Sequence, residues 1–164
     1  MESKTAEELL QFIGESPSAF HAVDTMKRML DARQYEQLLE GDTWELSPGG
    51  KYYVIRGGTS LIAFRIPSAS RVHGGFRGFQ IMASHSDSPT FKVKENPEME
   101  AEKAYVKLNV EKYGGMLIAP WFDRPLSVAG RLIVRENGRI VSKLVNVDKD
   151  LLLIPSLAVH MDRQ

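Results

Sequence analysis

The hydrophobic pattern at the start of the chain predicts two helices. Residues 5–8, Thr-Ala-Glu-Glu, form a capping-box sequence, and apolar residues follow at helical spacing as far as residue 13, before Gly14. Residues 16–18, Ser-Pro-Ser, mark the start of a second helix, which we expect to end near Ala32. One face of this second helix is apolar and is expected to pack into a core; it carries Phe20, Val23, Met26, Met29 and Leu30.

Alternating polar and apolar residues then predict a β-hairpin. Residues 51–56 and 59–64 have strand-like composition, and they flank the dipeptide Gly57-Gly58. A diglycine pair readily adopts the positive φ angles that tight hairpin turns require. We therefore expect two antiparallel strands joined at this pair.

A further strand is predicted over residues 79–84, where Phe, Ile and Ala alternate with Gln, Met and Ser. This strand leads directly to His85. The preceding residues 71–78, which include His73, are glycine-rich and are expected to form a loop. Two helices followed by strands predict the beginning of an α/β domain.

The second half of the chain has the pattern of β structure after a charged connection. Residues 92–103 are mostly charged and contain Pro97, so we expect them to connect two structural units. Residues 106–110 alternate in the manner of a half-buried strand. Residues 129–135 and 139–145 flank Glu-Asn-Gly, and Asn-Gly is a strong hairpin signal. The chain beyond the connection is therefore predicted to be all-β.

Composition excludes several classes of function. The chain has 164 residues, with 21 lysines and arginines against 21 aspartates and glutamates, and no cysteine. The balanced charge gives no general attraction to nucleic acid or to an anionic membrane. The lack of cysteine excludes a disulfide framework, a cysteine-based zinc site and a thiol nucleophile. The first residues do not resemble a secretory signal and no apolar run has membrane-spanning length, so we expect a cytoplasmic protein.

His85 and Asp87 are the candidate functional residues. In a strand, residues two apart project from the same face, so the imidazole and the carboxylate are expected to lie side by side at a strand end. Such an imidazole can bind a metal through one nitrogen while the carboxylate accepts a hydrogen bond from the other nitrogen and fixes the tautomer. For the tripeptide alone, a His–Asp hydrogen bond that closes a turn is the simpler interpretation.

The histidines show no spacing that would predict a complete metal site within this chain. A catalytic zinc normally has three protein ligands, whereas the histidines here number four and are scattered: His21, His73, His85 and His160. Packing explains a histidine in the second predicted helix more simply than metal binding does, and solvation explains one in the glycine-rich loop. Any metal site must therefore draw its remaining ligands from another segment or subunit.

Six motifs, in one order, resemble a known protein family. They are SPSAFHAV (residues 16–23), W-x-L-x-x-GGKYYV (44–54), ASHSDSP (83–89), KYGG (112–115), WFDRPLSVAGR (121–131) and IPSLAVHMDR (154–163). Together they resemble the M18 family of aminopeptidases, the aspartyl aminopeptidase group to which vacuolar aminopeptidase I is related. Each motif is modest alone, but their shared order over nearly the whole chain is not expected by chance.

The resemblance implies a co-catalytic metallopeptidase, in which an α/β domain that holds two divalent metal ions is interrupted by a β-rich dimerisation domain. Residues 1–92 would be the N-terminal part of the catalytic domain, and residues 93–164 the first part of the dimerisation domain. Zinc is the expected metal, and manganese and cobalt suit the same ligands. Family members act on peptides and form large tetrahedral assemblies built from dimers, so a homo-oligomer is expected, a dodecamer at full length.

The family's functional residues carry over to three positions. In the family, the His of the H-x-D-S-P motif is a metal ligand, which implies that role for His85. The Asp of the same motif orients this His and is counted as catalytic, which implies that role for Asp87. The His of the IPSLA-x-H motif reaches a neighbouring subunit's active site and helps to stabilise bound substrate, which implies substrate binding by His160; a surface residue of the β domain is the alternative. Asp123 and Arg124 are expected to form an ion pair or a turn.

The chain resembles only the opening part of a family member. The segments that bring the other metal ligands and the general base are absent from it, so the chain alone is expected to be inactive. Three origins fit: a deliberately expressed portion, a proteolytic product, or one part of a nicked enzyme paired with its missing C-terminal part. A non-catalytic β-rich dimerisation or assembly module is the alternative function.

A sheet interrupted in mid-domain exposes strand edges and core surface, so we expect the chain to self-associate. The family includes enzymes that prefer acidic N-terminal residues and others that prefer apolar ones. Neither this preference nor the identity of the metal follows from the residues present.

Overall fold

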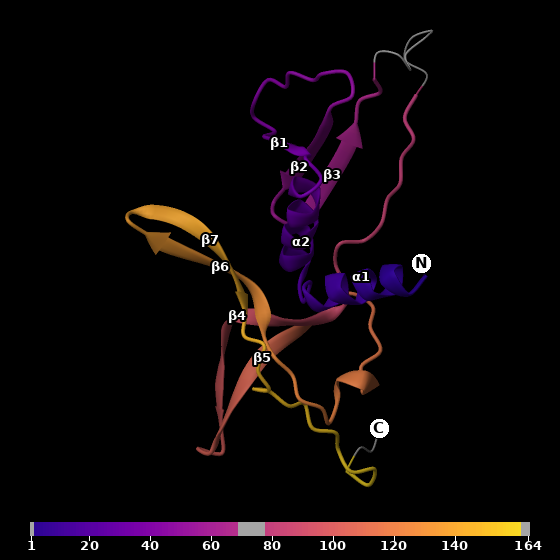
Figure 1. Cartoon of the computed structure of the whole chain (residues 1–164). Helices are drawn as coiled ribbons and strands as arrows, with labels where there is room; N and C mark the ends of the chain where they lie inside the picture. Colours follow the sequence, from indigo (N-terminus) through magenta and orange to yellow (C-terminus); the bar gives the residue numbers. More distant parts are fainter. Residues whose placement is uncertain (1, 69–77, 162–164) are drawn as a thin grey trace. The chain divides into compact units, whose positions relative to one another are not determined.

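The structure is a computed structural model that describes residues 2–68 and 78–161 (Figure 1). The predicted glycine-rich loop with His73 falls almost wholly outside these ranges. The described residues form helices and strands, which confirms the α/β class.

The chain divides into two compact units. The first, here called the helix–sheet unit, comprises Met1–Asp87 and Ala129–Asn146. The second, here called the ribbon unit, comprises Ser88–Val128 and Val147–Gln164. The assignment of residues 1–92 to a catalytic domain and 93–164 to a dimerisation domain concerns function and stays a prediction.

Both predicted helices form. Helix α1 spans Glu2–Gly14 and helix α2 spans Ala19–Asp31. The side chain of Ser18 caps α2 by accepting a hydrogen bond from a backbone N–H of the first turn, as the Ser-Pro-Ser sequence predicts. Helix α1 begins before Thr5, so the predicted capping box lies inside the helix. Of the apolar stripe predicted for α2, Val23 is buried and the other members are half-buried or exposed.

A three-stranded sheet follows the helices. Strands β1 (Glu36–Leu38), β2 (Lys51–Arg56) and β3 (Ser60–Arg65) lie in that order, with β1 parallel and β3 antiparallel to β2. The predicted hairpin is confirmed. Gly57 and Gly58 turn the chain with φ angles of 62° and 76°, a region that glycine occupies without steric cost. Strand β1 was not predicted, because three residues are too few to display a period.

The buried residues of the described chain all belong to the helix–sheet unit. Tyr53 on β2 has no exposed surface. The others come from α2, β1 and β2: Ala22, Val23, Thr25, Leu38 and Tyr52. The core of the molecule therefore lies where α2 packs on the three-stranded sheet.

The expectation that residues 92–103 form a connection is wrong. They belong largely to strand β4 (Thr90–Ala101), which pairs in antiparallel register with strand β5 (Tyr105–Tyr113). The register shifts between Val93 and Glu98, a stretch that contains Pro97. Proline is tolerated in sheets at such irregularities, and a two-stranded ribbon with exposed faces accommodates charged side chains without burying them. The charged composition of this segment therefore reflects the exposure of a paired strand and not an absence of secondary structure.

The second predicted hairpin is confirmed. Strand β6 (Ala129–Glu136) pairs with strand β7 (Arg139–Asn146) through a two-residue loop. Asn137 and Gly138 in this loop have φ angles of 49° and 78°. Two positive φ angles characterise the turn type whose twist matches that of paired strands.

Arg131 on β6 attaches this hairpin to the rest of the helix–sheet unit. Its guanidinium lies 4.2 Å from the centroid of the Phe20 ring on α2, a cation–π contact. It also donates a hydrogen bond to the Gly57 carbonyl, with an N···O distance of 3.1 Å. One side chain thus joins the second hairpin to the first hairpin's turn and to a helix.

The predicted strand over residues 79–84 does not form. These residues have no regular secondary structure and belong to none of the sheets in the described part of the chain. Their apolar side chains are exposed; Met82, for example, is 94% exposed. Alternation reports which side chains could share a face, but a strand also needs a neighbour in hydrogen-bonded register. The described sheets do not supply that neighbour.

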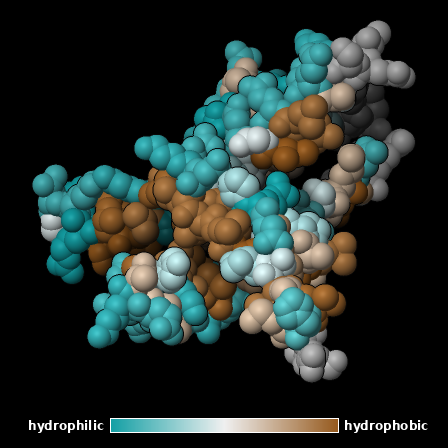
Figure 2. Space-filling view, turned by 90° about the horizontal axis from the view of Figure 1, so that it is seen from below, coloured by the Kyte–Doolittle hydropathy of each residue, from teal (hydrophilic) through white to brown (hydrophobic). Residues whose placement is uncertain are grey.

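Large apolar side chains are exposed on both units. Figure 2 shows brown, hydrophobic areas between hydrophilic ones on the face that it presents. The exposed apolar residues include Leu9, Leu10, Ile62, Ile81, Leu132 and Ile140 in the helix–sheet unit, and Val106, Leu117, Leu153, Leu157, Val159 and Met161 in the ribbon unit. Among the described helices, none has both the length and the apolar character needed to cross a membrane.

Candidate functional site

His85 and Asp87 lie beside each other, as predicted. The distance between His85 Nδ1 and Asp87 Oδ1 is 3.1 Å, within hydrogen-bond range. The pair sits on the segment that runs from β3 to β4 rather than at the end of a strand. The contact that we predicted from strand geometry is therefore present although the strand is not.

Ser86, between the two candidates, anchors this segment to the first hairpin. Its hydroxyl donates to the backbone carbonyl of Thr59 at 2.8 Å. Thr59 belongs to the turn between β2 and β3, which the Gly57-Gly58 pair shapes. One hydrogen bond in the middle of the tripeptide therefore ties the His–Asp segment to the β2–β3 turn.

The geometry defines which imidazole nitrogen is available. An ionised carboxylate only accepts hydrogen bonds, so in the bond to Asp87 the Nδ1 of His85 is the donor. The Nε2 of a neutral ring then carries the lone pair. The His85 side chain is 93% exposed, so this lone pair faces open space. A carboxylate that fixes the tautomer of an imidazole in this way is the usual arrangement around a metal-binding histidine.

The His85–Asp87 pair fits one ligand position of a metal ion rather than a whole site. In the described ranges, no three His, Cys, Asp or Glu side chains come close enough together to hold a metal. A catalytic zinc normally has three protein ligands. Any further ligands would have to come from outside the described residues.

His160 lies in the ribbon unit, whereas His85 and Asp87 lie in the helix–sheet unit. It is exposed and belongs to a turn in which the Met161 N–H donates to the Ala158 carbonyl at 2.8 Å. The turn presents the imidazole to solvent, which is compatible both with binding outside the chain and with a plain surface position.

His21 has a local structural role. Its Nδ1 lies 2.8 Å from the Ser18 hydroxyl, the same group that caps α2. Partial burial lowers the pKa of His21, and the nearby Asp24 carboxylate opposes this shift. The prediction that packing, not metal binding, explains this histidine agrees with its position.

Asp123 and Arg124 form a turn, the second of the two predicted alternatives. Asp123 has a φ angle of 53°, in the left-handed region, and its carboxylate binds Ser156. Arg124 donates to the Pro120 carbonyl at 3.4 Å. The bond to Ser156 could not be predicted, because the two residues are 33 positions apart and no local pattern relates them.

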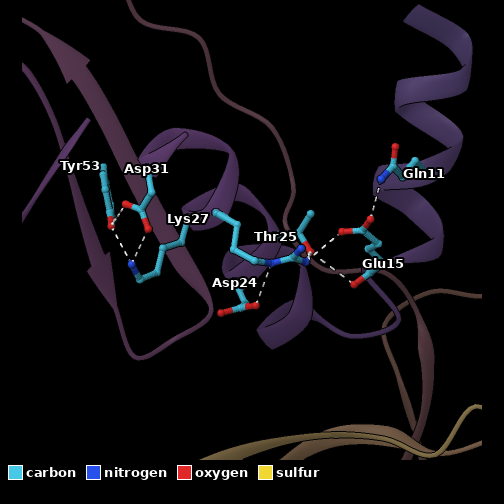
Figure 3. Close-up of polar contacts among 8 residues, drawn as sticks. Gln11, Glu15, Asp24, Thr25, Lys27, Asp31 and Tyr53 are labelled. Carbon is cyan, nitrogen blue, oxygen red and sulfur yellow. Dashed lines mark hydrogen bonds and ion pairs between the residues drawn. The ribbon is translucent and has the colours of Figure 1, made fainter. Parts of the chain in front are cut away.

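A polar cluster between α2 and β2 was also missed (Figure 3). The Tyr53 hydroxyl donates to Asp31 Oδ1 at 2.7 Å, and Lys27 donates to Asp31 Oδ2 at 2.7 Å and to the Tyr53 oxygen at 3.1 Å. These bonds, that from Lys27 first, hold the pKa of Asp31 below its ordinary value. The four-residue spacing of Lys27 and Asp31 was the available signal. All three groups bind one another, so the cluster joins helix to sheet and offers no free ligand.

The chain matches the sequence model of one protein family. The family is described as "Aminopeptidase I zinc metalloprotease (M18)", and the match covers residues 12–164. The match and the α/β fold thus place the chain among the metallopeptidases. The chain belongs to the M18 family of aminopeptidases, which confirms the resemblance found in its motifs.

Relatives and solved structures agree with this assignment. A probable M18 family aminopeptidase 2 from Clostridium novyi is 45% identical over 162 residues, which are 98% of this chain and 37% of the relative. The structure of mApe1 from Chaetomium thermophilum matches with a TM-score of 0.86 at 37% identity, over 94% of this chain and 35% of that one. The yeast mApe1 dodecamer matches with a TM-score of 0.83 at 34% identity, over 95% of this chain and 36% of that one.

The chain spans little more than a third of the length of the curated relatives that it matches.

Proposed function

We propose that this chain is the N-terminal portion of a two-metal aminopeptidase of the M18 family, which removes N-terminal residues from peptides. The observation that carries the proposal is the His85–Asp87 pair, with its 3.1 Å contact, in a chain whose family is described as a zinc metalloprotease. The chain alone is inactive in this proposal, because it contributes only one corner of the metal site.

Each member of the pair has a defined task. His85 binds one metal through Nε2, and Asp87 accepts the Nδ1 proton and holds the ring in the orientation that points Nε2 outward. Ser86 keeps the tripeptide on the β2–β3 turn, so the imidazole moves little when it binds. When bound, divalent metal ions provide the Lewis acidity that polarises a scissile carbonyl and activates water. Zinc is the proposed metal.

His160 acts in this proposal on a peptide bound by a neighbouring subunit. Its exposed imidazole, held in a turn of the ribbon unit, supports such a role. The assembly of a solved relative as a dodecamer supports the existence of a neighbouring subunit. The whole enzyme is therefore proposed to be a homo-oligomer in which the ribbon unit contributes to contacts between copies.

The test uses a polypeptide of family length that carries this sequence as its N-terminal portion. Aminopeptidase activity on aminoacyl substrates should disappear when a chelator removes the metals and return when zinc is added back. His85→Ala should abolish most of the activity, whereas the matched variant His21→Ala should keep it, because the His21 ring contacts the Ser18 cap of α2 and has no part in the proposed metal site. Full activity of His85→Ala, or activity that survives chelation, would overturn the proposal.

A second candidate function is a non-catalytic assembly module. The observation that favours it is the large number of exposed apolar side chains in the ribbon unit, including Val159 and Met161. If the chain serves only assembly, a family-length polypeptide will bind no stoichiometric metal and cleave no aminoacyl substrate, although it will oligomerise.

A further inference from the structure

Two segments of the ribbon unit that are distant in sequence are bonded to each other. The backbones of Leu126 and Leu152 form an antiparallel bridge, with N···O distances of 2.9 Å from Leu126 and 3.0 Å from Leu152. Three residues earlier, the Asp123 N–H donates to the Ile154 carbonyl at 3.0 Å. The segment that contains Asp123 therefore runs alongside the residues that lead to His160.

The Asp123 carboxylate extends this contact by one further step. Its Oδ1 accepts a hydrogen bond from the Ser156 N–H at 3.0 Å, and its Oδ2 accepts one from the Ser156 hydroxyl at 2.5 Å. The hydroxyl, and then the N–H, hold the pKa of Asp123 below its ordinary value, so the carboxylate is charged at neutral pH. Hydrogen bonds to a charged acceptor are stronger than those between neutral groups. The Asp123 carboxylate thus accepts from both hydrogen-bond donors of Ser156, its N–H and its hydroxyl.

Asp123 adopts an uncommon backbone conformation in making these bonds. Its φ of 53° is in the left-handed region, which aspartate tolerates better than most residues but still at a cost. The same conformation directs its backbone N–H to Ile154 and its carboxylate to Ser156. The bonds to Ile154 and Ser156 therefore stabilise the left-handed backbone conformation of Asp123.

The described residues beyond Ser156 have few hydrogen bonds. In residues 157–161 the described hydrogen bonding consists of the turn from Met161 to Ala158. The side chains of Leu157, Val159 and His160 are exposed. His160 is four positions beyond Ser156, so its Cα atom can lie at most about 14 Å from that of Ser156. The direction in which the chain leaves Ser156 therefore decides where His160 can reach.

We propose that Asp123 is a positioning residue for His160, which it serves by binding Ser156 and thereby fixing where the segment that carries His160 begins within the ribbon unit. The inference rests on the proposed substrate-binding role of His160. It gives a task to the WFDRPLSVAGR motif, which contains Asp123. The ligand on which the two residues act is a peptide bound by a neighbouring copy of the enzyme.

The test measures KM and kcat of the family-length enzyme with an aminoacyl substrate. Asp123→Ala should raise KM by roughly 10-fold to 100-fold with a much smaller change in kcat, because misplaced binding groups lose substrate affinity. Ser156→Ala, which removes only the hydroxyl, should change KM in the same direction by less. Asp148→Ala is the matched control, because Asp148 is an exposed aspartate with a φ of 49° in the same unit.

The double variant Asp123→Ala/His160→Ala decides whether the two residues act together. If Asp123 acts through His160, the double variant should have the same KM as His160→Ala alone. Independent, additive effects would overturn the inference, and so would dissociation of the oligomer by Asp123→Ala in light scattering.

The single variants separate the inference from the proposed function. A raised KM for His160→Ala beside a wild-type KM for Asp123→Ala would contradict the inference alone. Wild-type kinetics for His160→Ala would contradict the role proposed for His160 and, with it, the inference.

Hydrogen exchange in the 164-residue chain tests the clamp without any catalysis. The Ser156 amide should exchange faster in Asp123→Ala than in the wild type, and Asp148→Ala should leave it unchanged. Equal exchange rates in all three proteins would overturn the clamp, whatever the enzyme assays give.

Discussion

The two units hold their shape in different ways. In the helix–sheet unit, α2 packs on a three-stranded sheet and buries Tyr53 completely. In the described part of the ribbon unit no residue is buried. Its contacts include the β4–β5 ladder, the Leu126–Leu152 bridge, the Asp123–Ser156 bonds and an edge-to-face contact between the Phe91 and Trp121 rings. A buried core therefore stabilises the first unit, whereas hydrogen bonds and partly exposed contacts hold the second.

This difference has a consequence for the candidate residues. His85 and Asp87 are attached through Ser86 to a turn of the packed sheet, so their position depends on a core that this chain contains. In our proposal, the position of His160 depends instead on the Asp123–Ser156 bonds, which lie in a unit with no buried residue in its described part. We therefore expect the His85–Asp87 pair to adopt its conformation in this chain alone. We expect the segment that carries His160 to become fully ordered only against a neighbouring subunit.

The largest effect should come from truncating the core tyrosine. Tyr53→Ala removes a fully buried ring and should lower the free energy of unfolding by about 3–5 kcal/mol, the range found for large aromatic truncations. Tyr105→Ala, in the ribbon unit and 71% exposed, should change it by less than about 0.5 kcal/mol. Urea unfolding followed by circular dichroism measures both. Similar effects of the two variants would remove the contrast between the units.

Next in size is the effect of the carboxylate on metal binding. In the family-length enzyme, Asp87→Asn should weaken zinc binding by roughly 10-fold to 100-fold. The carboxylate can only accept a hydrogen bond from His85 Nδ1, whereas an amide is uncharged and can also donate, so it no longer fixes the tautomer. Asp42→Asn, at an exposed position of the same unit, should leave the affinity unchanged. Competition with a chromogenic chelator gives the two affinities. A wild-type affinity for Asp87→Asn would remove Asp87 from the site.

A smaller effect should follow from changing the turn that holds the His–Asp segment. Gly58→Ala places a side chain at a φ of 76°, which costs about 1–2 kcal/mol of unfolding free energy. The new methyl group would meet Phe20 at 3.6 Å, an ordinary contact, so backbone strain should dominate. Gly130→Ala on β6, where nothing lies within 4 Å, is the control and should cost far less. Equal urea midpoints for the two variants would contradict this account of the turn.

The smallest effect concerns acid stability. The hydrogen bonds from Lys27 and Tyr53 lower the pKa of Asp31 in the folded state, so their stabilisation is complete above the ordinary value of 3.8 and is lost as the pH falls through the lower folded value. Asp31→Asn should be less stable than the wild type near neutral pH and should lose less stability below pH 3.8. Urea midpoints across this range measure the slope, with Asp150→Asn as the control. Parallel slopes for Asp31→Asn and the wild type would show that the cluster contributes nothing to acid sensitivity.

Local turn chemistry made part of the fold predictable. The Gly57-Gly58 and Asn137-Gly138 pairs identified both hairpins, because each pair supplies the positive φ angles that the observed turns use. The Ser18 cap likewise identified the start of α2. These signals lie within a few residues of the structure that they determine.

The predictions that were wrong concern features that depend on residues distant in sequence. Strand β4 was missed because its charged residues reflect an exposed ribbon, and residues 79–84 were assigned to a strand because alternation cannot reveal whether a neighbouring strand exists. Of the candidate site, the His85–Asp87 contact was predictable from a two-residue spacing. The Asp123–Ser156 clamp was not, because it joins segments that only the folded chain brings together.

The most direct test of the central claim is the metal content of the family-length enzyme and its His85→Ala variant. The account predicts two zinc ions per wild-type chain, as in two-metal hydrolases, and a loss of one of them in His85→Ala, with His21→Ala unchanged. A His85→Ala variant that retains the full wild-type metal content would contradict the assignment of the His85–Asp87 pair to the metal site.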